Sequence, residues 1–244
     1  MRYSIKTGSP EKINADCLVV AIWNKGTLSD EAKAIDAPAK KAISKILQSG
    51  DFTGKLGETQ LIHNANGVAA KRILLIGAGE KKKFSGKSAA KLLSAALRAT
   101  RKLQASSLHF ALNSLDASDR DGNWVAARLA QEAEIASYQY DTTKSKKAKA
   151  LATKSISLGA FAGSRRKNLE AALKRGQSIG KAVNRARELG NLPGNVCTPS
   201  YLAQQATAIA DRNRSVTTQV LSEKQMARLG MGSLLSVSAG SVEE

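Results

Sequence analysis

The stretch ADCLVVAIW, residues 15–23, decides the fold class of this chain of 244 residues. Its apolar side chains follow one another without the polar alternation of a half-exposed strand, which is typical of a strand buried on both faces of a sheet. A second run, KRILLIG at residues 71–77, has the same character. Strands of this kind occur in parallel sheets that carry helices on both faces. The two runs therefore predict an α/β fold.

Further strands and helices alternate outward from these two runs. Strands are predicted over residues 2–7, 58–63, 107–112 and 154–159. Apolar residues at helical spacing predict helices over residues 38–47, 85–103 and 119–138. This alternation implies a mixed, mostly parallel sheet flanked by helices, with right-handed crossovers between parallel strands.

One long amphipathic helix is predicted over residues 165–189, and a hinge follows it. The predicted buried side of this helix consists of Leu169, Ala172, Leu173, Ile179, Ala182, Val183 and Ala186. In the stretch ARELGNLPGNVCTPSYLA, residues 186–203, Gly190 and Pro193 end the helix and Thr198 caps a new one. The pattern beyond the hinge predicts the beginning of a second α/β domain, with helices at 199–212 and 222–229 and strands at 217–221 and 234–237.

Basic residues are in large excess and are unevenly distributed. The chain has 38 lysines and arginines against 20 aspartates and glutamates, which gives a net charge of +18. Residues 71–110 hold ten basic and one acidic side chain, and residues 141–190 hold thirteen and three. A field of one sign attracts polyanions. Two other interpretations stay open: an ordinary solvated surface, and basic faces that meet acidic faces of a further part of the protein.

The candidate contacts to duplex DNA are the densest basic runs. They are Lys81, Lys82, Lys83, Arg101, Lys102, Lys144, Lys146, Lys147, Lys149, Arg165, Arg166 and Lys167. Aromatic residues make up only 4% of the chain and do not interleave with these runs, which argues against base stacking on a single strand. No helix with Arg, Asn or Gln at base-reading spacing stands out, so we expect little sequence preference.

Two glycine-containing segments approach the pattern of phosphate-binding loops without completing it. Gly77 and Gly79 follow a strand, but the third glycine of the dinucleotide fingerprint is replaced by Lys82. Gly86-Lys87-Ser88 lacks the upstream glycine of a Walker motif. Both are interpreted as structural turns. A crevice at the carboxyl ends of the strands, near residues 24–26 and 77–79, would still allow nucleotide binding of the ADP-ribose kind, and this alternative stays open.

The sequence around the histidines and cysteines predicts no catalytic or metal site. His63 and His109 each lie in a predicted strand without an acidic or cysteine neighbour. The patterns His-Glu-x-x-His and Gly-x-Ser-x-Gly are absent, and so is any paired-cysteine spacing. Cys17 lies in an apolar strand and Cys197 lies in the hinge, so both are interpreted as structural.

The hydropathy pattern indicates where in the cell the protein is expected. No run approaches the roughly 18 apolar residues of a membrane span, and the first residues lack the apolar segment of a signal peptide. We therefore expect a cytoplasmic protein with no membrane partner.

Four segments together resemble the leucyl (cytosol) aminopeptidase family. They are residues 186–203, EKQMARLGMG at 223–232, SAGS at 238–241 and IASYQYD at 135–141. The resemblance implies a macro-domain-like N-terminal domain at residues 1–153, a strand and linker helix at 154–190, and the truncated start of a catalytic peptidase domain at 191–244.

The resemblance also implies a chemistry. Members of this family are two-metal hydrolases that use two divalent cations, manganese or zinc, to release N-terminal amino acids from peptides, and they assemble as hexamers. Their metal ligands come from Gly-Lys-Gly followed by Phe-Asp and from Asn-Thr-Asp-Ala-Glu-Gly-Arg, and neither motif occurs here. The chain alone is therefore expected to be inactive. The alternative is a basic nucleic-acid-binding module without catalysis.

Overall fold

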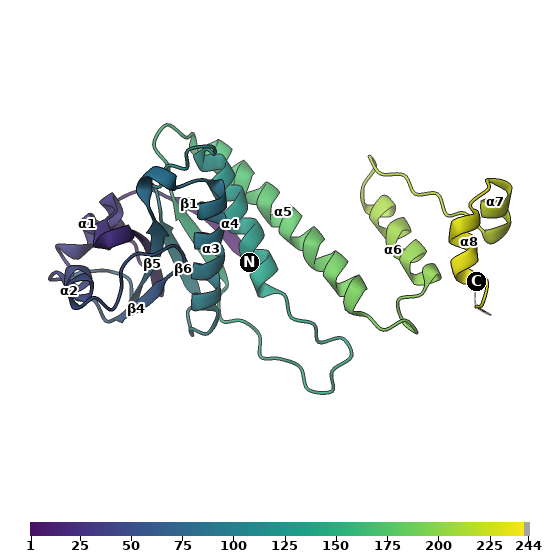
Figure 1. Ribbon diagram of the computed structural model, residues 1–244, viewed down its shortest axis with the longest axis horizontal. Coiled ribbons are helices and arrows are strands. Elements are labelled where there is room, and N and C mark those ends of the chain that lie inside the picture. Colours follow the sequence, from purple (N-terminus) through teal and green to yellow (C-terminus); the bar gives the residue numbers. More distant parts are fainter. Residues whose placement is uncertain (242–244) are drawn as a thin grey trace. The chain divides into compact units, whose positions relative to one another are not determined.

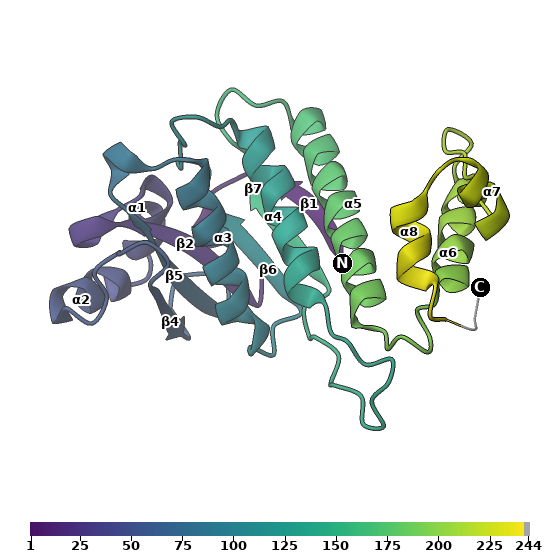
Figure 2. The same ribbon diagram turned by 45° about the vertical axis from the view of Figure 1, so that its right-hand side comes forward.

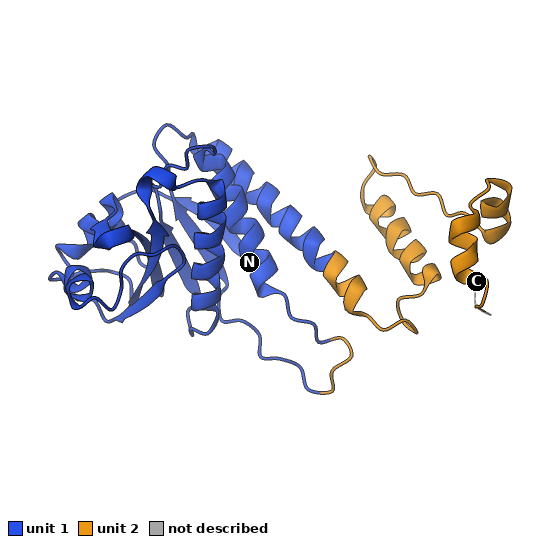
Figure 3. Cartoon of the chain, viewed as in Figure 1, with its two compact units in different colours: residues 1–141, 146–185 blue, residues 142–145, 186–244 orange. Residues whose placement is uncertain are grey.

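A computed structural model describes residues 1–241, which fall into two compact units. Figure 3 shows the first unit, residues 1–141 and 146–185, in blue, and the second unit, residues 142–145 and 186–244, in orange. The first unit contains a sheet with helices on both faces, and the described part of the second unit contains helices.

Seven strands form one sheet in the first unit. They are β1 (Arg2–Lys6), β2 (Cys17–Trp23), β3 (Thr27–Leu28), β4 (Thr59–His63), β5 (Arg72–Gly79), β6 (Ser107–Ala111) and β7 (Ser155–Gly159). Their order is β1-β7-β6-β2-β5-β4, with β3 paired to β2. The pairs that join β1, β7, β6, β2 and β5 are parallel, whereas β3 and β4 run antiparallel to their partners. The predicted mixed, mostly parallel sheet is confirmed.

β2 lies inside this sheet and is buried over its whole length. Cys17, Val19 and Ala21 pack into the core on one face, while Leu18 and Val20 pack into the core on the other. Successive side chains of a strand point to opposite faces, so a strand covered on both sides must be apolar at every position. This explains the uninterrupted apolar run in the sequence.

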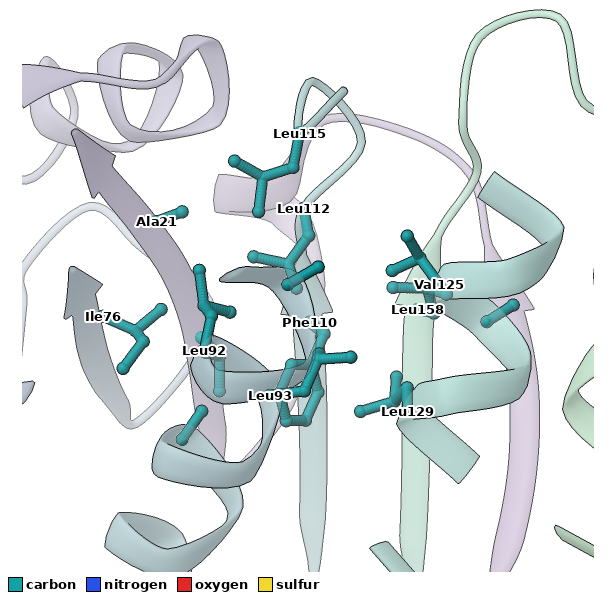
Figure 4. Close-up of a cluster of buried hydrophobic side chains, with 14 of the residues drawn as sticks. Ala21, Ile76, Leu92, Leu93, Phe110, Leu112, Leu115, Val125, Leu129 and Leu158 are labelled. Carbon is teal, nitrogen blue, oxygen red and sulfur yellow. The ribbon is translucent and has the colours of Figure 1, made fainter. Parts of the chain in front are cut away.

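Two helices, α3 (Gly86–Arg101) and α4 (Gly122–Ser137), cover one face of the sheet, and α5 (Arg166–Asn191) packs beside α4 (Figures 1 and 2). Figure 4 shows Leu92 and Leu93 of α3 and Val125 and Leu129 of α4 directed toward Phe110 of β6. Full burial of one such aliphatic side chain contributes about 1.5–3 kcal/mol. This layer therefore holds most of the apolar core.

The opposite face carries two short helices, α1 (Asp30–Asp36) and α2 (Ala42–Ser49), where the sequence predicted one helix at 38–47. Lys40 and Lys41 have φ angles of 53° and 61°, which a right-handed helix does not contain. The Asp36 carboxylate accepts the N–H groups of Ile43 (2.9 Å) and Ser44 (3.1 Å). A helix break stabilised by a distant capping carboxylate thus replaces a continuous helix.

Two glycines allow α5 to approach α4 closely. A Cβ atom at Gly176 would lie 1.9 Å from the carbonyl oxygen of Ala127, and one at Gly180 would lie 2.6 Å from the Cβ of Glu134. Both distances are far below van der Waals contact, so this packing requires residues without a side chain. This close approach was not predicted from the sequence, although the Gly-x-x-x-Gly spacing places both glycines on one side of a helix.

The buried side of α5 is shorter than its apolar pattern predicted. Leu169, Ala172 and Leu173 are buried as predicted, whereas Ile179, Ala182 and Ala186 are exposed. Asn184 Nδ2 of α5 donates a hydrogen bond to the carbonyl oxygen of Glu134 (2.7 Å), and α4 ends three residues later at Ser137. Beyond that point α5 has no length of α4 left to pack against.

The second unit contains α6 (Pro199–Arg212), α7 (Glu223–Arg228) and α8 (Gly232–Ser238). Between residues 186 and 241, no residue is buried. The strands predicted at 217–221 and 234–237 are wrong, because the first segment is irregular and the second lies in α8. A strand needs a neighbouring strand for its N–H and C=O groups, whereas a helix satisfies them locally.

The domain boundaries predicted at residues 153 and 190 stay predictions. The compact units divide the chain differently: the second unit begins at residue 186 and also includes residues 142–145. In addition, β7 pairs with both β1 and β6. This strand therefore belongs to the sheet of the first unit rather than to a linker.

Candidate functional site

The Gly77 and Gly79 turn at the end of β5 is closed by the chain itself. The N–H of Gly77 donates to the carbonyl oxygen of Glu58 (2.8 Å), and the N–H of Gly79 donates to that of Gly54 (3.0 Å). A Cβ atom at Gly77 would lie 1.9 Å from the carbonyl oxygen of Lys55. The amides that a phosphate would need are thus bonded within the protein. This geometry agrees with the interpretation of these glycines as a structural turn.

A cavity of about 640 Å³ lies at the carboxyl ends of β6 and β7. It is lined by residues 113–116, 120–123 and 161–165 and by Asn168. The sequence placed a crevice elsewhere, near residues 24–26 and 77–79, but the loop containing Thr53 and Gly54 bonds to Gly26 and Gly79 there. The nucleotide-binding alternative would therefore have to use the cavity beside β6 and β7.

The polar residues around this cavity hold its loops in place. Ser114 donates its N–H to one oxygen of the buried Glu31 carboxylate (2.7 Å) and its hydroxyl to the other (2.5 Å). Asp121 caps α4 by accepting the N–H of Trp124 (2.8 Å), and this bond holds the pKa of the Asp121 carboxyl below its usual range. Arg120 lies over the Trp124 ring at 5.7 Å. The cavity has room for a small polar molecule, but the residues described around it do not form a catalytic arrangement.

The two histidines lie in different surroundings. His109 of β6 is only 1% exposed, and its Nδ1 lies 2.9 Å from the Ser157 hydroxyl of β7. Burial lowers the pKa of His109 to about 4, and the charge of Lys6 acts in the same direction. His63 is exposed at the end of β4. A neutral imidazole held between two strands agrees with a structural role for His109.

Acidification from pH 7 to pH 4 is expected to destabilise the fold through His109. Its pKa falls from 6.5 to about 4 on folding, so the unfolded state binds the proton first. Stability is present above pH 6.5 and is lost as the pH falls toward 4. The difference corresponds to about 3 kcal/mol. Urea unfolding at several pH values should show a smaller acid loss for His109→Gln. His63→Gln should keep the original pH dependence, and equal behaviour of the two variants would contradict this assignment.

The described residues do not gather the ligands of a metal centre. Across residues 1–241, no group of three or more His, Cys, Asp or Glu side chains is placed to hold a metal ion. Both cysteines are free. Burial raises the pKa of the Cys17 thiol to about 12, which disfavours the thiolate form that metals bind. These residues do not fit a two-metal site.

The twelve basic residues predicted to contact nucleic acid lie at both ends of the sheet. Lys81–Lys83 follow β5 and residues 165–167 follow β7, both at the carboxyl end of the strands. Arg101 and Lys102 end α3, which leads back to the amino end of β6, and the lysines of residues 144–149 lie in the loop that leads to the amino end of β7. All twelve are exposed. Those that lie in the first unit are therefore divided between the two ends of its sheet.

Three further exposed basic residues, Lys87, Lys91 and Arg98 of α3, lie between the two ends and were not among the predicted contacts. They share a face of the helix with Arg101. Two sequence signals could have found them: their helical spacing, and the complete absence of Asp and Glu from residues 81–115.

Comparison with known families matches both parts of the chain. Residues 19–147 match the cytosol aminopeptidase family, N-terminal domain, and residues 184–244 match the cytosol aminopeptidase family, catalytic domain.

Curated relatives extend this match over the whole chain. The probable cytosol aminopeptidase of Methylobacillus flagellatus is 37% identical over 246 residues, covering 100% of this chain and 49% of that relative. The probable cytosol aminopeptidase of Nitrosococcus oceani is 37% identical over 244 residues, covering 99% and 48%. The chain thus spans about half the length of these relatives.

Solved structures share the fold. A mutant of tomato leucine aminopeptidase superimposes with a TM-score of 0.84 at 22% identity, covering 100% of this chain and 49% of that one. The bottromycin maturation enzyme BotP in complex with Mn has a TM-score of 0.67 at 21% identity, covering 94% and 43%. Together with the family and sequence matches, these findings show that the chain belongs to the cytosol aminopeptidase family.

Proposed function

We propose that this chain forms the N-terminal part of a leucyl aminopeptidase, a two-metal hydrolase that releases N-terminal amino acids from peptides. One observation carries the proposal: residues 19–147 and 184–244 match, in order, the two successive domains of the cytosol aminopeptidase family. The chain spans about half the length of its curated relatives. It would therefore supply the N-terminal domain and the first elements of the catalytic domain.

The proposal places the catalytic centre outside the described residues. Residues 1–241 do not gather a set of metal ligands, so we assign no catalytic or metal-binding residue to them. Divalent cations at such a centre would polarise the scissile carbonyl group and activate a water molecule. The relative BotP has been solved in complex with Mn, which supports manganese, with zinc as the alternative.

Exposed apolar side chains in the second unit support a larger catalytic domain. Large exposed hydrophobic residues of this unit are Val196, Leu202, Ile209, Val216, Val220, Leu229, Met231, Leu234 and Val237. Val237 is 84% exposed although it lies in a helix. Exposed apolar surface of this kind marks a place where further protein packs. We infer that additional residues of the catalytic domain cover these side chains.

The isolated 244-residue chain is expected to show no hydrolysis of leucine p-nitroanilide with added Mn²⁺ or Zn²⁺. The same chain followed by the residues that succeed it in its gene should hydrolyse this substrate in a metal-dependent manner. A preparation treated with chelator serves as the control for both proteins. Metal-dependent turnover by the short chain would contradict our placement of the metal ligands. An extended protein that stays inactive with either metal would contradict the proposed activity.

We further propose that the whole protein is a cytoplasmic hexamer that acts on peptides and has no membrane partner. The curated relatives are named cytosol aminopeptidases, which supports this location. In the part of the chain that the structure describes, none of the helices has the length and apolar character needed to cross a bilayer. Light scattering on the extended protein would measure its oligomeric state.

A further inference from the structure

The cavity at the carboxyl ends of β6 and β7 contains a buried hydrogen-bond acceptor that the protein itself leaves unpaired. Asn113 lies two residues beyond the end of β6 and lines the cavity. Its Oδ1 atom is buried and has no donor among the described residues. A Cβ atom at Gly159, the last residue of β7, would lie 1.8 Å from this oxygen. The end of β7 therefore accommodates the carboxamide, and a donor on a bound molecule would complete its hydrogen bonding.

A second residue that lines this cavity also has a buried, unpaired oxygen. Asn123 lies in the first turn of α4, where its Nδ2 donates to the Asp121 carboxylate (2.9 Å). Its Oδ1 is buried and lacks a donor within the part of the chain that the structure describes. Phe161 forms the adjoining wall, and a Cβ atom at Gly122 would lie 2.6 Å from its Cγ. The cavity thus combines tightly packed walls with two unused acceptors.

The lining of the cavity also includes one acidic and one basic side chain that stay unpaired. Asp116 and Arg165 are exposed, and neither forms an ion pair within the described residues 1–241. Arg165 directly precedes α5, where the positive end of the helix dipole favours an anion. The other two charged residues of the lining have partners, since Asp121 caps α4 and Arg120 donates to the carbonyl oxygen of Asp119 (2.8 Å). The cavity therefore offers charges of both signs to a ligand.

We propose that this cavity binds a small zwitterion of the amino acid or short-peptide class. The ammonium group of such a ligand donates to the unpaired oxygens of Asn113 and Asn123 and pairs with Asp116. Its carboxylate pairs with Arg165, in the charge-assisted contact that guanidinium groups favour. The volume of about 640 Å³ lies in the range of sites for small organic ligands and has room for a dipeptide.

Ligands with charge of one sign suit the cavity less well. A phosphate group would meet Asp116 and Asp121 as well as Arg165, and like charges repel. A nucleotide base would find no open aromatic face, because Phe161 of the lining is buried. A metal ion is disfavoured because residues 1–241 provide no group of three His, Cys, Asp or Glu side chains to hold it. A zwitterion is the ligand that uses both the unpaired acid and the unpaired base.

The test titrates L-leucyl-L-leucine into the 244-residue chain and measures the dissociation constant by calorimetry. Two blocked analogues each lack one charge: N-acetyl-leucyl-leucine has no ammonium group, and leucyl-leucine amide has no carboxylate. Both should bind at least about 10-fold more weakly than the dipeptide, because each loses charged hydrogen bonds. Equal affinity for the three molecules would overturn the proposal, and so would the absence of dipeptide binding at about 10 mM.

This result does not rest on the proposed hydrolysis, although peptides are also the substrates of that reaction. The 244-residue chain is expected to be inactive, and chromatography checks that the dipeptide stays intact during the titration. The two proposals can therefore fail separately, because an extended protein without peptidase activity would leave the measured binding to the short chain unchanged.

Single substitutions assign the two ends of the ligand. Asp116→Asn and Arg165→Gln should each weaken dipeptide binding by at least about 10-fold. Asp116→Asn should leave the affinity for N-acetyl-leucyl-leucine within about twofold of the parent, because this analogue has no ammonium group to lose. Asp211→Asn and Lys167→Gln remove the same kinds of charge from exposed positions outside the lining and should bind like the parent. Equal weakening in these two controls would overturn the proposal, because it would reflect net charge rather than contact.

Asn113→Leu separates ligand binding from a structural role of the carboxamide. The variant keeps a branched side chain of similar size and removes the buried acceptor, so the melting temperature without ligand should equal or exceed that of the parent. Dipeptide binding should weaken by at least about 10-fold. A lower melting temperature together with unchanged binding would overturn the proposal, because the carboxamide would then serve the fold alone. Inorganic phosphate is the probe for a simple anion site, and phosphate that binds more tightly than the dipeptide would also overturn it.

Discussion

Replacing Gly176 by alanine is expected to lower the free energy of unfolding of the first unit by about 2 kcal/mol. The new Cβ atom would lie 1.9 Å from the carbonyl oxygen of Ala127, which is backbone and cannot rotate away. The helices must separate, and the buried contacts of Leu169, Ala172 and Leu173 weaken with them. This loss outweighs the roughly 1 kcal/mol by which alanine is favoured over glycine in a helix interior. The melting temperature should fall by about 4–8 °C.

A matched control lies in the same helix. Gly190 has no atom within 4 Å of the position of an added Cβ, so Gly190→Ala tests helix propensity without a clash. This variant should be as stable as the parent or slightly more stable. Urea and thermal unfolding of the two variants give the comparison. If Gly176→Ala were as stable as Gly190→Ala, the close approach of α5 to α4 would be disproved.

Amide hydrogen exchange is expected to differ by at least about a thousandfold between the core of the sheet and the second unit of the 244-residue chain. Amides of β2 and β5 lie in strands that are paired on both sides, and they should exchange only through global unfolding. Those of α6, α7 and α8 should exchange through local opening, because none of these helices has a buried residue.

Exchange in α3 provides the internal control for this comparison. It is a helix like α6, but eight of its residues are buried, so its central amides should be protected almost as well as those of the strands. Slow exchange in α6 would mean that another copy of the chain covers its exposed Leu202 and Ile209. Measurement at several protein concentrations would reveal such an association.

The sheet could be predicted from sequence because its central strands are marked by local composition. β2 is buried over its whole length and β5 is buried from Ile73 to Ala78, so both stretches are uninterrupted apolar runs in the sequence. The strand β3 has only two residues and was missed. The helix α1 was not predicted. The turn after α1 was instead assigned to the same helix as α2, because the break between α1 and α2 depends on the carboxylate of Asp36, which caps Ile43 from seven residues away.

The errors and omissions share one physical cause, which is dependence on neighbours distant in sequence. Residues 234–237 have the composition of a strand, but residues 186–241 supply no strand for them to pair with, and a local helix forms instead. The cavity beside β6 and β7 forms only where three loops meet, so no single segment of the sequence predicts it. The basic residues Lys87, Lys91 and Arg98 of α3 do not form a run in the sequence as residues 144–149 do, because Lys87 and Arg98 are separated by three turns of helix.

The position of β7 has a consequence for how the chain folds during synthesis. β7 lies between β1 and β6, and Arg2 pairs with Ser155. At about 5–20 residues per second, a ribosome needs roughly 8–30 s to deliver the strand that joins these two. The unpaired β1 carries little risk of misassembly in that interval, because Ile5 is the one side chain of this strand that is buried in the finished fold. β6 is different, since four of its five residues become buried in the finished fold. Until β7 is synthesised, the edge of β6 that pairs with β7 stays exposed and apolar. A nascent chain with this strand order is thus vulnerable to edge-to-edge misassembly for several seconds, and chaperones would act on that edge.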